Sequence, residues 1–337
     1  MSITIKEIAK LAQVSTATVS MILNKKDQCI GDATREKVLA IAAEHHYIPN
    51  NAARSLVTRK TNTIGLIMPD ITNPFFPEIA RGAEDKASES RYSIIFCNTD
   101  DSERQEEKYI DILTEKMVDG IIFAHAAESE EGCSGLNKCK LPVILIDRDY
   151  NNENVKGRVV VDNEKGSYSG VSHLIKQGYR KILYIAGAIK TQTAKDRLAG
   201  YRRALSENLI DYKDYYVKSG SYRREWGYEA MGQFLNENIP FDSVFCGNDL
   251  IAFGAIKKLK EAGYRIPEDI GVVGFDDIYV SSMMEPALTT VKQPNYEMGY
   301  RAVELLIDVL EKKNLESNHK IVLDTELVVR NSTRLLK

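Results

Sequence analysis

Cysteine is scarce in this chain, and the few cysteines that occur are scattered. There are five: Cys29, Cys97, Cys133, Cys139 and Cys246. An odd, scattered set is typical of reduced thiols in the cytosol and does not indicate a disulfide framework. Cys133 and Cys139 are spaced wrongly for a metal knuckle, and no histidine pair accompanies them. We therefore expect no metal site.

Long apolar runs and a leader sequence are missing as well. No segment has the length and hydrophobicity of a membrane span, and Met1 leads directly into an amphipathic stretch rather than a signal peptide. The 337 residues are 43% hydrophobic and 28% charged, which is typical of a globular protein with two or three domains. These features predict a cytoplasmic protein with no membrane partner.

The signatures of common enzyme classes are also absent. The sequence has no P-loop, no Gly-x-Gly-x-x-Gly, no Gly-x-Ser-x-Gly and no His/Cys cluster with metal-ligand spacing. We therefore expect a protein that is not an enzyme and that carries no cofactor.

Positive charge is concentrated at the N-terminal end. The net charge of the chain is –3, but residues 1–60 hold nine basic and five acidic residues, a balance of +4, which leaves –7 for the rest. A basic head on an acidic body is consistent with a head that binds DNA phosphates.

The first helix of this head is predicted from its capping signal. Thr4 and Glu7 have the spacing of a capping box, so a helix can begin at Ile5. Ile8, Leu11 and Ala12 then share one apolar face. The next two residues, 13 and 14, form a turn.

A second helix follows at once. Ser15 is a good N-cap for a helix from Thr16 to about Leu23. Val19 and the other apolar residues of this segment can face the first helix, which leaves an outward face made of Thr16, Ala17, Thr18, Ser20 and Met21. Two short helices with small polar residues at the start of the second predict a helix-turn-helix, whose second helix would read base edges in a major groove.

The rest of the head contains a third helix and a linker. Asp32 can cap the third helix, which has an apolar face of Val38, Leu39, Ile41 and Ala42 and stops before Pro49. Residues 50–57 can form about two helical turns. Residues 58–63 are polar and indicate a linker.

From residue 63 onward the pattern alternates between strands and helices. A first set of short apolar strands is expected at 64–68, 92–97, 120–123 and 143–146, with helices after Pro74 and over 103–117. A second set begins near 159–161 and continues at 181–185, 243–246 and 270–273. Val/Ile runs separated by helices predict two lobes, each with a doubly wound parallel sheet. Ligands of such sheets bind at the carboxyl ends of the strands, here in the cleft between the lobes.

Sequence motifs along nearly the whole chain resemble the LacI/GalR family of bacterial repressors. They are the head motif of residues 4–24, Tyr47–Leu56, Ile64–Phe76, Val118–Ile122, Asp162–Asn163, Arg197–Tyr201, Gly247–Asp249, Gly271–Asp276 and Leu288–Pro294. The resemblance implies an all-α helix-turn-helix head before an α/β core similar to periplasmic sugar-binding proteins of type I. It also implies a bacterial protein associated with the nucleoid.

The family layout implies boundaries for each part. The head would cover 1–49 and the hinge helix and linker 50–62. The N-terminal lobe would cover 63–161 plus 291–323, and the C-terminal lobe 162–290 plus 324–337. The chain would then cross between the lobes near Asp162, near Leu288–Thr290 and near Leu323. The sequence ends without room for the family's tetramerising leucine-heptad tail, so we expect a homodimer.

Operator DNA is the first expected partner. Thr16 and Ala17 can read base edges, the methyl group being suited to thymine. Met21 stands where many family members have an arginine that suits guanine, so the operator should differ there. Leu56 resembles the family's leucine wedge, which opens a base step from the minor groove; packing of Leu56 onto the core is the alternative. The candidate DNA-binding residues are Thr4, Ser15, Thr16, Ala17, Thr18, Ser20, Met21, Lys25, Asn51, Ala53, Arg54 and Leu56.

A small effector, most simply a sugar, is the second expected partner. The resemblance implies effector contacts for Arg197 and Asp276 and a stacking role for Tyr222, and Asn248 favours a sugar over a nucleobase. Structural roles are the alternative: Asp276 could cap a turn, and Arg197 could pair with an acid of its own lobe. The candidate effector residues are Phe75, Phe76, Asp147, Asp162, Thr193, Arg197, Tyr222, Asn248 and Asp276.

Two other functions remain open at this stage. A secreted sugar-binding protein would share the core but would have a signal peptide in place of the helix-turn-helix. A catabolite-control regulator would take a phosphorylated carrier protein as corepressor, which requires basic residues on the helix after Pro294. That segment carries Glu297, Glu304, Asp308 and Glu311 against Arg301, so this interpretation ranks second.

Overall fold

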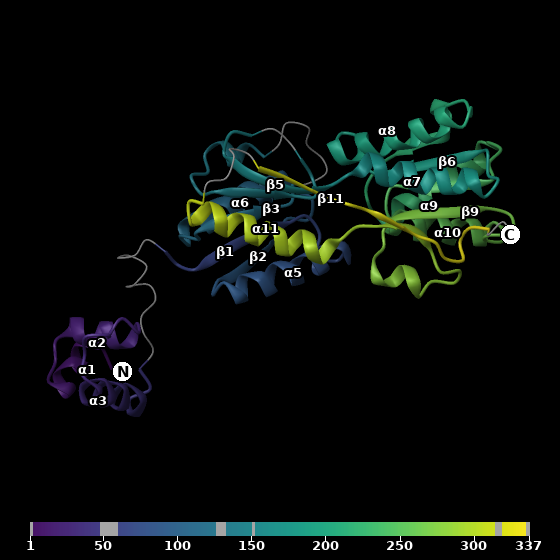
Figure 1. Ribbon diagram of the computed structural model, residues 1–337. Coiled ribbons are helices and arrows are strands. Elements are labelled where there is room, and N and C mark those ends of the chain that lie inside the picture. Colours follow the sequence, from purple (N-terminus) through teal and green to yellow (C-terminus); the bar gives the residue numbers. More distant parts are fainter. Residues whose placement is uncertain (1–2, 48–59, 126–132, 150–151, 314–318, 335–337) are drawn as a thin grey trace. The chain divides into compact units, whose positions relative to one another are not determined.

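The computed structural model describes residues 3–47, 60–125, 133–149, 152–313 and 319–334 (Figure 1). The chain divides into two compact units, Met1–Thr61 and Asn62–Lys337, called here the head and the core. Among the described residues, no helix has both the length and the apolar character needed to cross a bilayer.

The described part of the head consists of helices α1 (Ile5–Ala12), α2 (Thr16–Leu23) and α3 (Asp32–Glu44). The capping box is confirmed: the backbone N–H of Thr4 donates to Glu7 Oε2 at 2.7 Å, and the Glu7 N–H donates to Thr4 Oγ1 at 3.3 Å. Ser15 Oγ accepts the backbone N–H of Thr18 at 3.0 Å, so the predicted start of the second helix is also confirmed.

The head buries a narrow apolar stripe from each helix. Ile8, Val19 and Val38 are fully buried at its centre. Leu11 and Leu39 were expected to face inward, but they are 51% and 45% exposed. The physical reason is size: three short helices enclose a small core, and small residues such as Ala9 of α1 and Ala42 of α3 fill the positions nearest the neighbouring helices.

The start of α3 differs from the expectation by one residue. Gly31, rather than Asp32, is the N-cap, and it has no side chain to accept a hydrogen bond. The Asp32 carboxylate instead forms an ion pair with Arg35, which also pairs with Asp27. The carboxylate in the first turn still favours the helix through its interaction with the helix dipole.

The first lobe of the core is built on one parallel sheet. Within the described residues its strands lie in the order β11-β5-β4-β3-β1-β2. Their bounds are β1 (Thr63–Met68), β2 (Ser93–Asn98), β3 (Gly120–Phe123), β4 (Val143–Ile146), β5 (Val155–Val161) and β11 (His319–Leu323). Helices α5 (Phe75–Glu89), α11 (Asn295–Leu310) and α6 (Glu103–Glu115) pack on this sheet, and the short η1 (Ser134–Asn137) packs against α6.

The second lobe repeats this plan. Its described strands lie in the order β12-β10-β9-β8-β6-β7, all parallel except the antiparallel β12. The strands are β6 (Ile182–Ala186), β7 (Val217–Ser219), β8 (Ser243–Cys246), β9 (Gly271–Asp276), β10 (Thr289–Lys292) and β12 (Glu326–Val328). The helices are α7 (Asn163–Lys176), α8 (Gln192–Glu207), α9 (Arg224–Asn236) and α10 (Asp249–Glu261), with short helices η2 (Asp214–Tyr216) and η3 (Tyr279–Ser282).

Two details of the expected strand pattern need correction. The strand at 159–161 was expected to begin the second set, but β5 pairs with β4 and β11 in the first sheet. The expected lobe boundary at 290/291 also falls inside β10, which pairs with β9 along its whole length. The chain therefore crosses to the first lobe after Lys292, because the last two residues of this strand still pair with β9 on one side and β12 on the other.

The chain passes between the lobes at three places in its described part. Asp162 connects β5 to α7, residues 293–294 connect β10 to α11, and residues 324–325 connect β11 to β12. These short connections lie side by side between the lobes (Figure 1). They form a hinge that can open the cleft while both sheets stay intact.

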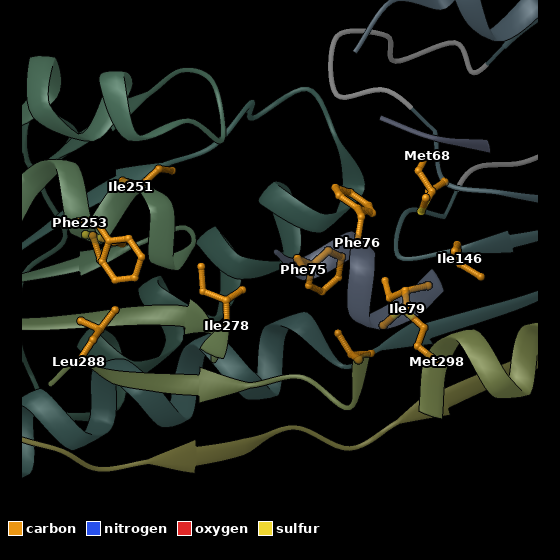
Figure 2. Packing of buried hydrophobic residues seen from close by; sticks show 14 of the residues in the cluster. Met68, Phe75, Phe76, Ile79, Ile146, Ile251, Phe253, Ile278, Leu288 and Met298 are labelled. Atoms are coloured by element: carbon orange, nitrogen blue, oxygen red, sulfur yellow. The ribbon is translucent and has the colours of Figure 1, made fainter. Parts of the chain in front are cut away.

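Glycines let three helix pairs of the core approach closely. A Cβ atom at Gly299 of α11 would lie 1.9 Å from the carbonyl oxygen of Ile79 on α5, and one at Gly82 of α5 would lie 1.9 Å from that of Tyr296. Gly227 and Gly254 fill the same role between α9 and α10, and Gly200 between α7 and α8. Figure 2 shows buried apolar side chains of both lobes, among them Phe75, Phe76 and Ile79 of α5.

We expect Gly299→Ala to destabilise the core. The added methyl group cannot fit against the backbone of α5, so the helices must move apart, at a cost of about 1–3 kcal/mol. Gly232→Ala in α9 is the matched control, because its Cβ would meet only the end of the Lys258 side chain at 3.3 Å and the helix should gain up to ~1 kcal/mol. Urea unfolding followed by circular dichroism measures both, and equal effects of the two substitutions would contradict the close-packing interpretation.

Candidate functional site

The head presents the start of α2 to solvent. Thr16 and Ala17 are exposed and Met21 is 40% exposed, whereas Val19 and Ile22 point into the head. This face therefore offers a hydroxyl, a methyl group and a thioether for contacts with base edges. Thr18 and Ser20, also expected on this face, are only half-buried.

Other candidate DNA contacts have different settings. The hydroxyl groups of Thr4 and Ser15 cap α1 and α2, so they hold the helix N-termini whose free N–H groups are suited to phosphates. Lys25 is exposed just beyond α2, with a φ of 56°. Asn51, Ala53, Arg54 and Leu56 lie outside the described residues.

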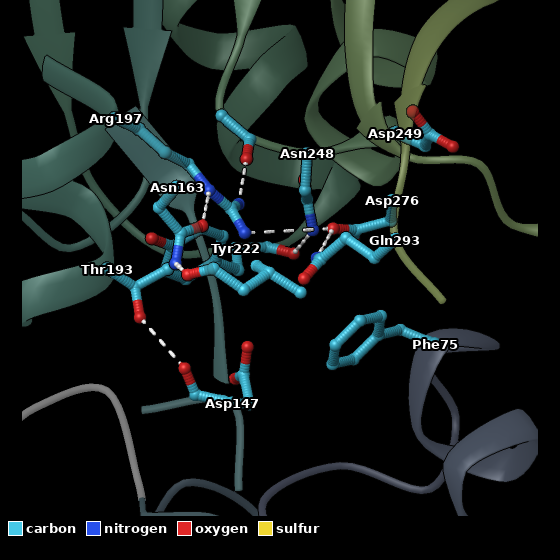
Figure 3. A network of polar contacts seen from close by, with 12 residues as sticks. Phe75, Asp147, Asn163, Thr193, Arg197, Tyr222, Asn248, Asp249, Asp276 and Gln293 are labelled. Carbon is cyan, nitrogen blue, oxygen red and sulfur yellow. Dashed lines mark hydrogen bonds and ion pairs between the residues drawn. The ribbon is translucent and has the colours of Figure 1, made fainter. Parts of the chain in front are cut away.

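The cleft between the two lobes of the core forms a pocket with about 300 Å³ of empty space, part of it open to solvent. Its walls come from loops at the carboxyl ends of the strands and from the first turns of α5 and α8. The lining residues are Asn73, Phe75, Phe76, Asp147, Arg148, Thr193, Arg197, Tyr222, Asn248, Asp276 and Gln293. In Figure 3, Phe75 and Asp147 of the first lobe face Arg197, Asn248 and Asp276 of the second.

Eight of the nine candidate effector residues line this pocket, and Asp162 does not. Its carboxylate accepts the backbone N–H of Lys165 at 2.9 Å and caps α7. The structure therefore does not bring Asp162 together with the other candidates, because a strand-end aspartate that starts a helix turns its oxygens toward that helix.

Arg197 is the central cation of the pocket and is only 2% exposed. Its Nε donates to Asn163 Oδ1 at 2.8 Å and its Nη1 donates to the carbonyl oxygen of Gly247. The guanidinium lies 3.7 Å from the centroid of the Phe275 ring, and its Nη2 lies 4.0 Å from Asp276 Oδ1. Arg197 is therefore paired with an acid of its own lobe, Asp276, as the structural alternative predicted. It lines the pocket as well.

Asp276 is held by the hinge as well as by Arg197. Gln293, on the crossing after β10, donates from Nε2 to Asp276 Oδ1 at 2.7 Å. Burial raises the pKa of Asp276 well above its usual range, and the nearby Arg197 charge opposes the rise. Gln293 Oε1 is buried and has no hydrogen-bond partner among the described residues, so it is available to a donor in the pocket.

Asp147 and Arg148 place a carboxyl group and a guanidinium group on the first-lobe side of the pocket. Arg148 Nε lies 3.6 Å from Asp147 Oδ2, and its Nη1 donates to the carbonyl oxygen of His125. Burial raises the pKa of Asp147, while the charges of Arg148 and Arg197 oppose the rise. The pocket therefore contains two buried carboxyl groups and two guanidinium groups.

Tyr222 and Asn248 both have structural roles as well as positions on the wall. The Tyr222 ring packs against Gly187, where a Cβ would lie 2.1 Å from Cζ, and lies between the guanidinium groups of Arg148 and Arg197, 5.6 and 6.0 Å from its centroid. Asn248 caps α10 through Oδ1 and donates from Nδ2 to the carbonyl oxygen of Tyr222 at 3.1 Å. One N–H of Asn248 remains for a ligand.

Sequence reasoning missed three of the pocket residues: Asn73, Arg148 and Gln293. All three lie close to residues that the sequence did indicate: Asn73 lies two residues before Phe75, Arg148 follows Asp147, and Gln293 precedes Pro294, the last residue of a family motif. Which neighbour faces the cleft depends on the backbone at the strand ends, for example the positive φ of 65° at Asp147.

A buried aspartate supports the second wall from behind. Asp249 accepts hydrogen bonds from Thr290 Oγ1 and Ser281 Oγ, both at 2.6 Å, and from the backbone N–H of Ile278 at 3.0 Å. It thereby joins the start of α10 to β10 and to the loop after Asp276. Burial raises the pKa of Asp249 to about 7.

This carboxyl makes the stability of the core depend on pH. The folded protein retains a proton at Asp249 that the unfolded chain releases near the ordinary pKa of 3.8. The contribution is fully present below about pH 4 and is lost as the pH rises through about 7, by roughly 1.4 kcal/mol per unit. Urea midpoints measured from pH 4 to 8 should fall more steeply for the wild type than for Asp249→Asn; parallel profiles would contradict this assignment.

Comparisons with known proteins identify the family. Residues 4–50 match the family model "Bacterial regulatory proteins, lacI family", and residues 61–329 match "Periplasmic binding proteins and sugar binding domain of LacI family". The chain therefore belongs to the LacI family, and it is a DNA-binding transcriptional regulator.

Several curated relatives align over nearly their whole length. The HTH-type transcriptional regulator RegA of Clostridium saccharobutylicum is 40% identical over 335 residues, which cover 99% of this chain and 100% of the relative. The ribose operon repressor of Halalkalibacterium halodurans is 37% identical, covering 98% and 97%. Catabolite control protein A of Priestia megaterium is 35% identical, covering 99% and 100%.

Solved structures confirm the expected fold. A lac repressor dimer bound to operator and the anti-inducer ONPF has a TM-score of 0.84 and 27% identity, with 99% of each chain covered. A LacI-family regulator from Enterococcus faecium with bound ribose has a TM-score of 0.73 and 31% identity, covering 82% of this chain and 100% of that one.

Proposed function

We propose that this protein represses carbohydrate uptake or catabolism genes and is switched by a small sugar in the interlobe cleft. It binds a pseudo-palindromic operator as a homodimer. The observation that carries the proposal is the cleft itself, where two carboxyl and two guanidinium groups meet beside Phe75 in a chain that also presents a helix-turn-helix.

The donor and acceptor pattern of the cleft suits a polyhydroxyl compound. Each sugar hydroxyl both donates and accepts, so it can bond to a carboxylate and a guanidinium at once. Asp147 and Asp276 supply acceptors, Arg148 and Arg197 supply donors, and Gln293 Oε1 adds a further acceptor. A ligand with one polar end would use few of these donors and acceptors, and each buried hydrogen-bonding position left without a partner would cost about 1–3 kcal/mol.

D-Ribose is the first sugar to consider. The ribose operon repressor is 37% identical to this chain over nearly all of its length, and the related Enterococcus faecium regulator was solved with ribose bound. A pentose also matches the small size of the pocket, whose walls already lie close together across the cleft.

The switch follows from the hinge. An effector that binds one arrangement of the lobes better than the other shifts the population of lobe positions. That shift changes the geometry of the segment leading to the DNA-binding head, and operator affinity changes by a coupling free energy of typically 1–3 kcal/mol. The coupling is reciprocal, so operator must change effector affinity by the same factor.

On DNA, the α2 face supplies the direct contacts. Thr16 and Ala17 would meet base edges at the start of the helix, with Met21 one turn further on. The thioether of Met21 cannot form the bidentate hydrogen bonds that an arginine makes to guanine. The operator half-site should therefore show no preference for guanine at the base pair that Met21 meets. The wedge role of Leu56 in the minor groove stays a prediction from the sequence.

The catabolite-control alternative would use a phosphoserine partner on the α5–α11 face. Its cations are already paired: Arg301 lies 2.6 Å from Glu304 and 3.5 Å from Glu297, and Arg81 lies 2.9 Å from Asp85. Carboxylates beside these cations disfavour a phosphate through like-charge repulsion. Similarity to catabolite control protein A keeps this alternative as an outcome of the test.

Fluorescence anisotropy tests the proposal directly. A labelled palindromic duplex with a CpG centre, taken from the gene's upstream region, is titrated with protein and then with D-ribose, other sugars and sugar phosphates. We expect tight, salt-sensitive binding that one sugar changes by about 5- to 150-fold. Binding that no small molecule alters, but that phosphorylated carrier protein strengthens, would overturn the sugar-responsive function.

Two aspartates provide a matched test of the effector site. Asp276→Asn replaces one carboxyl oxygen of the pocket with an NH2 group that cannot accept a hydrogen bond. It should weaken binding of the responding sugar by about 10- to 100-fold, because a buried hydroxyl left without its acceptor costs roughly 1–3 kcal/mol. Asp162→Asn keeps a good N-cap outside the pocket and should leave sugar binding unchanged. Isothermal titration calorimetry measures both; equal losses would argue against the pocket assignment.

A further inference from the structure

An aspartate outside the pocket lies between cations of both lobes. Asp101, in the loop between β2 and α6, has Oδ1 3.9 Å from Arg148 Nη1 and Oδ2 4.0 Å from Arg223 Nη2. Arg148 belongs to the first lobe and Arg223, the residue before α9, belongs to the second. The Asp101 carboxylate therefore connects the two lobes across the cleft.

The loop holds this carboxylate in place. The backbone N–H of Asp101 donates to the carbonyl oxygen of Pro69 at 3.1 Å, and its φ of 59° is a left-handed conformation. The Asp101 and Arg223 side chains are 25% and 53% exposed, whereas that of Arg148 is 9% exposed. Asp101 and Arg223 therefore lie nearer to solvent than Arg148, which lines the pocket.

Two other contacts join the lobes on this same side. Thr193 Oγ1 donates to the carbonyl oxygen of Asp147 at 3.4 Å, and the Arg148 guanidinium lies over the Tyr222 ring. Each contact needs the lobes to be close together. All of them form between protein groups alone, so they favour closure even when no effector is bound.

We propose that Asp101 and Arg223 are positioning residues of the effector site. They stabilise the closed arrangement through the ion pair between them, and neither of them lines the pocket. By mass action, a smaller closed population lowers the apparent affinity for any ligand that binds the closed form. Their removal should therefore weaken all such ligands by one common factor.

The chain offers a matched control beside each residue. Asp100, with a φ of 52°, is the neighbouring aspartate in the same loop and accepts from Asn98 Nδ2 of its own lobe at 2.6 Å. Arg224 follows Arg223 and pairs with Glu225 of its own helix at 3.0 Å. Asparagine tolerates the left-handed conformation, so Asp101→Asn and Asp100→Asn perturb the backbone equally little.

Single-molecule energy transfer on the ligand-free full chain tests closure. Dyes are attached through unnatural residues at Glu115 and Asn238, one in each lobe, and the labelled protein is diluted with unlabelled protein. We expect Asp101→Asn and Arg223→Gln each to reduce the ratio of closed to open molecules by about 1.5- to 5-fold, the range for partly exposed ion pairs. The double variant should show no further reduction, and Asp100→Asn and Arg224→Gln should match the wild type.

Ionic strength separates this role from a purely structural one. Salt screens an exposed ion pair, so the ratio of closed to open molecules should fall for the wild type as salt rises from 0.05 to 0.5 M. The same ratio should change less for Asp101→Asn, which lacks the ion pair. Additive effects of Asp101→Asn and Arg223→Gln, or ratios equal to those of the controls, would overturn the proposal. Urea unfolding of each variant verifies that the fold is intact.

A ligand titration extends the test and rests on the proposed function. With D-ribose as the probe, Kd should rise by the same factor in Asp101→Asn and in Arg223→Gln, and that factor should equal the loss of closed population. If D-ribose does not bind the wild type, the proposed effector is wrong, while the ligand-free measurement still decides the role of Asp101. If D-ribose binds all variants equally although closure changes, the positioning role is wrong.

Discussion

The buried guanidinium of Arg197 is the interaction on which the cleft depends. A cation that is 2% exposed is tolerable only when its N–H groups and its charge are satisfied. Here the start of α7 supplies Asn163, the loop after β8 supplies the Gly247 carbonyl, and the end of β9 supplies Asp276 and the Phe275 ring. One side chain from α8 therefore sets the relative positions of three chain segments that form the wall of the second lobe.

The doubly wound architecture makes such a wall possible. Parallel strands direct their carboxyl ends to one edge, and the helices that follow begin there. The glycines between α5 and α11, α7 and α8, and α9 and α10 bring the backbones of the paired helices into close contact. The three crossings then leave one main freedom, which is the opening of the two lobes.

Contacts across the cleft connect that freedom to ligand binding. Asp147, Arg148 and Asp101 of the first lobe meet Thr193, Tyr222 and Arg223 of the second through single hydrogen bonds, ring contacts and long ion pairs. Each is weak, so closure remains reversible. A reversible closure is what a regulator requires, because an effector shifts the equilibrium between the open and closed arrangements by its differential affinity for the two.

The sequence by itself determined the local signals and the overall class of the protein. The capping box at Thr4, the Ser15 cap, the outward face of α2 and most buried strands depend on residues close in the chain. The family resemblance and the positions of strand ends together indicated eight residues that line the pocket. The tertiary structure decided the remainder. The short strands β7, β10, β11 and β12 form because a neighbouring strand completes their hydrogen bonds. Asp162 and Asn248 both cap helices: the cap directs the Asp162 carboxylate toward α7 and away from the cleft, and it uses the side-chain oxygen of Asn248. Arg148, Gln293 and the Asp101–Arg223 contact became visible only in three dimensions, because the direction of a side chain at a strand end and the approach of distant loops are set by packing rather than by local sequence.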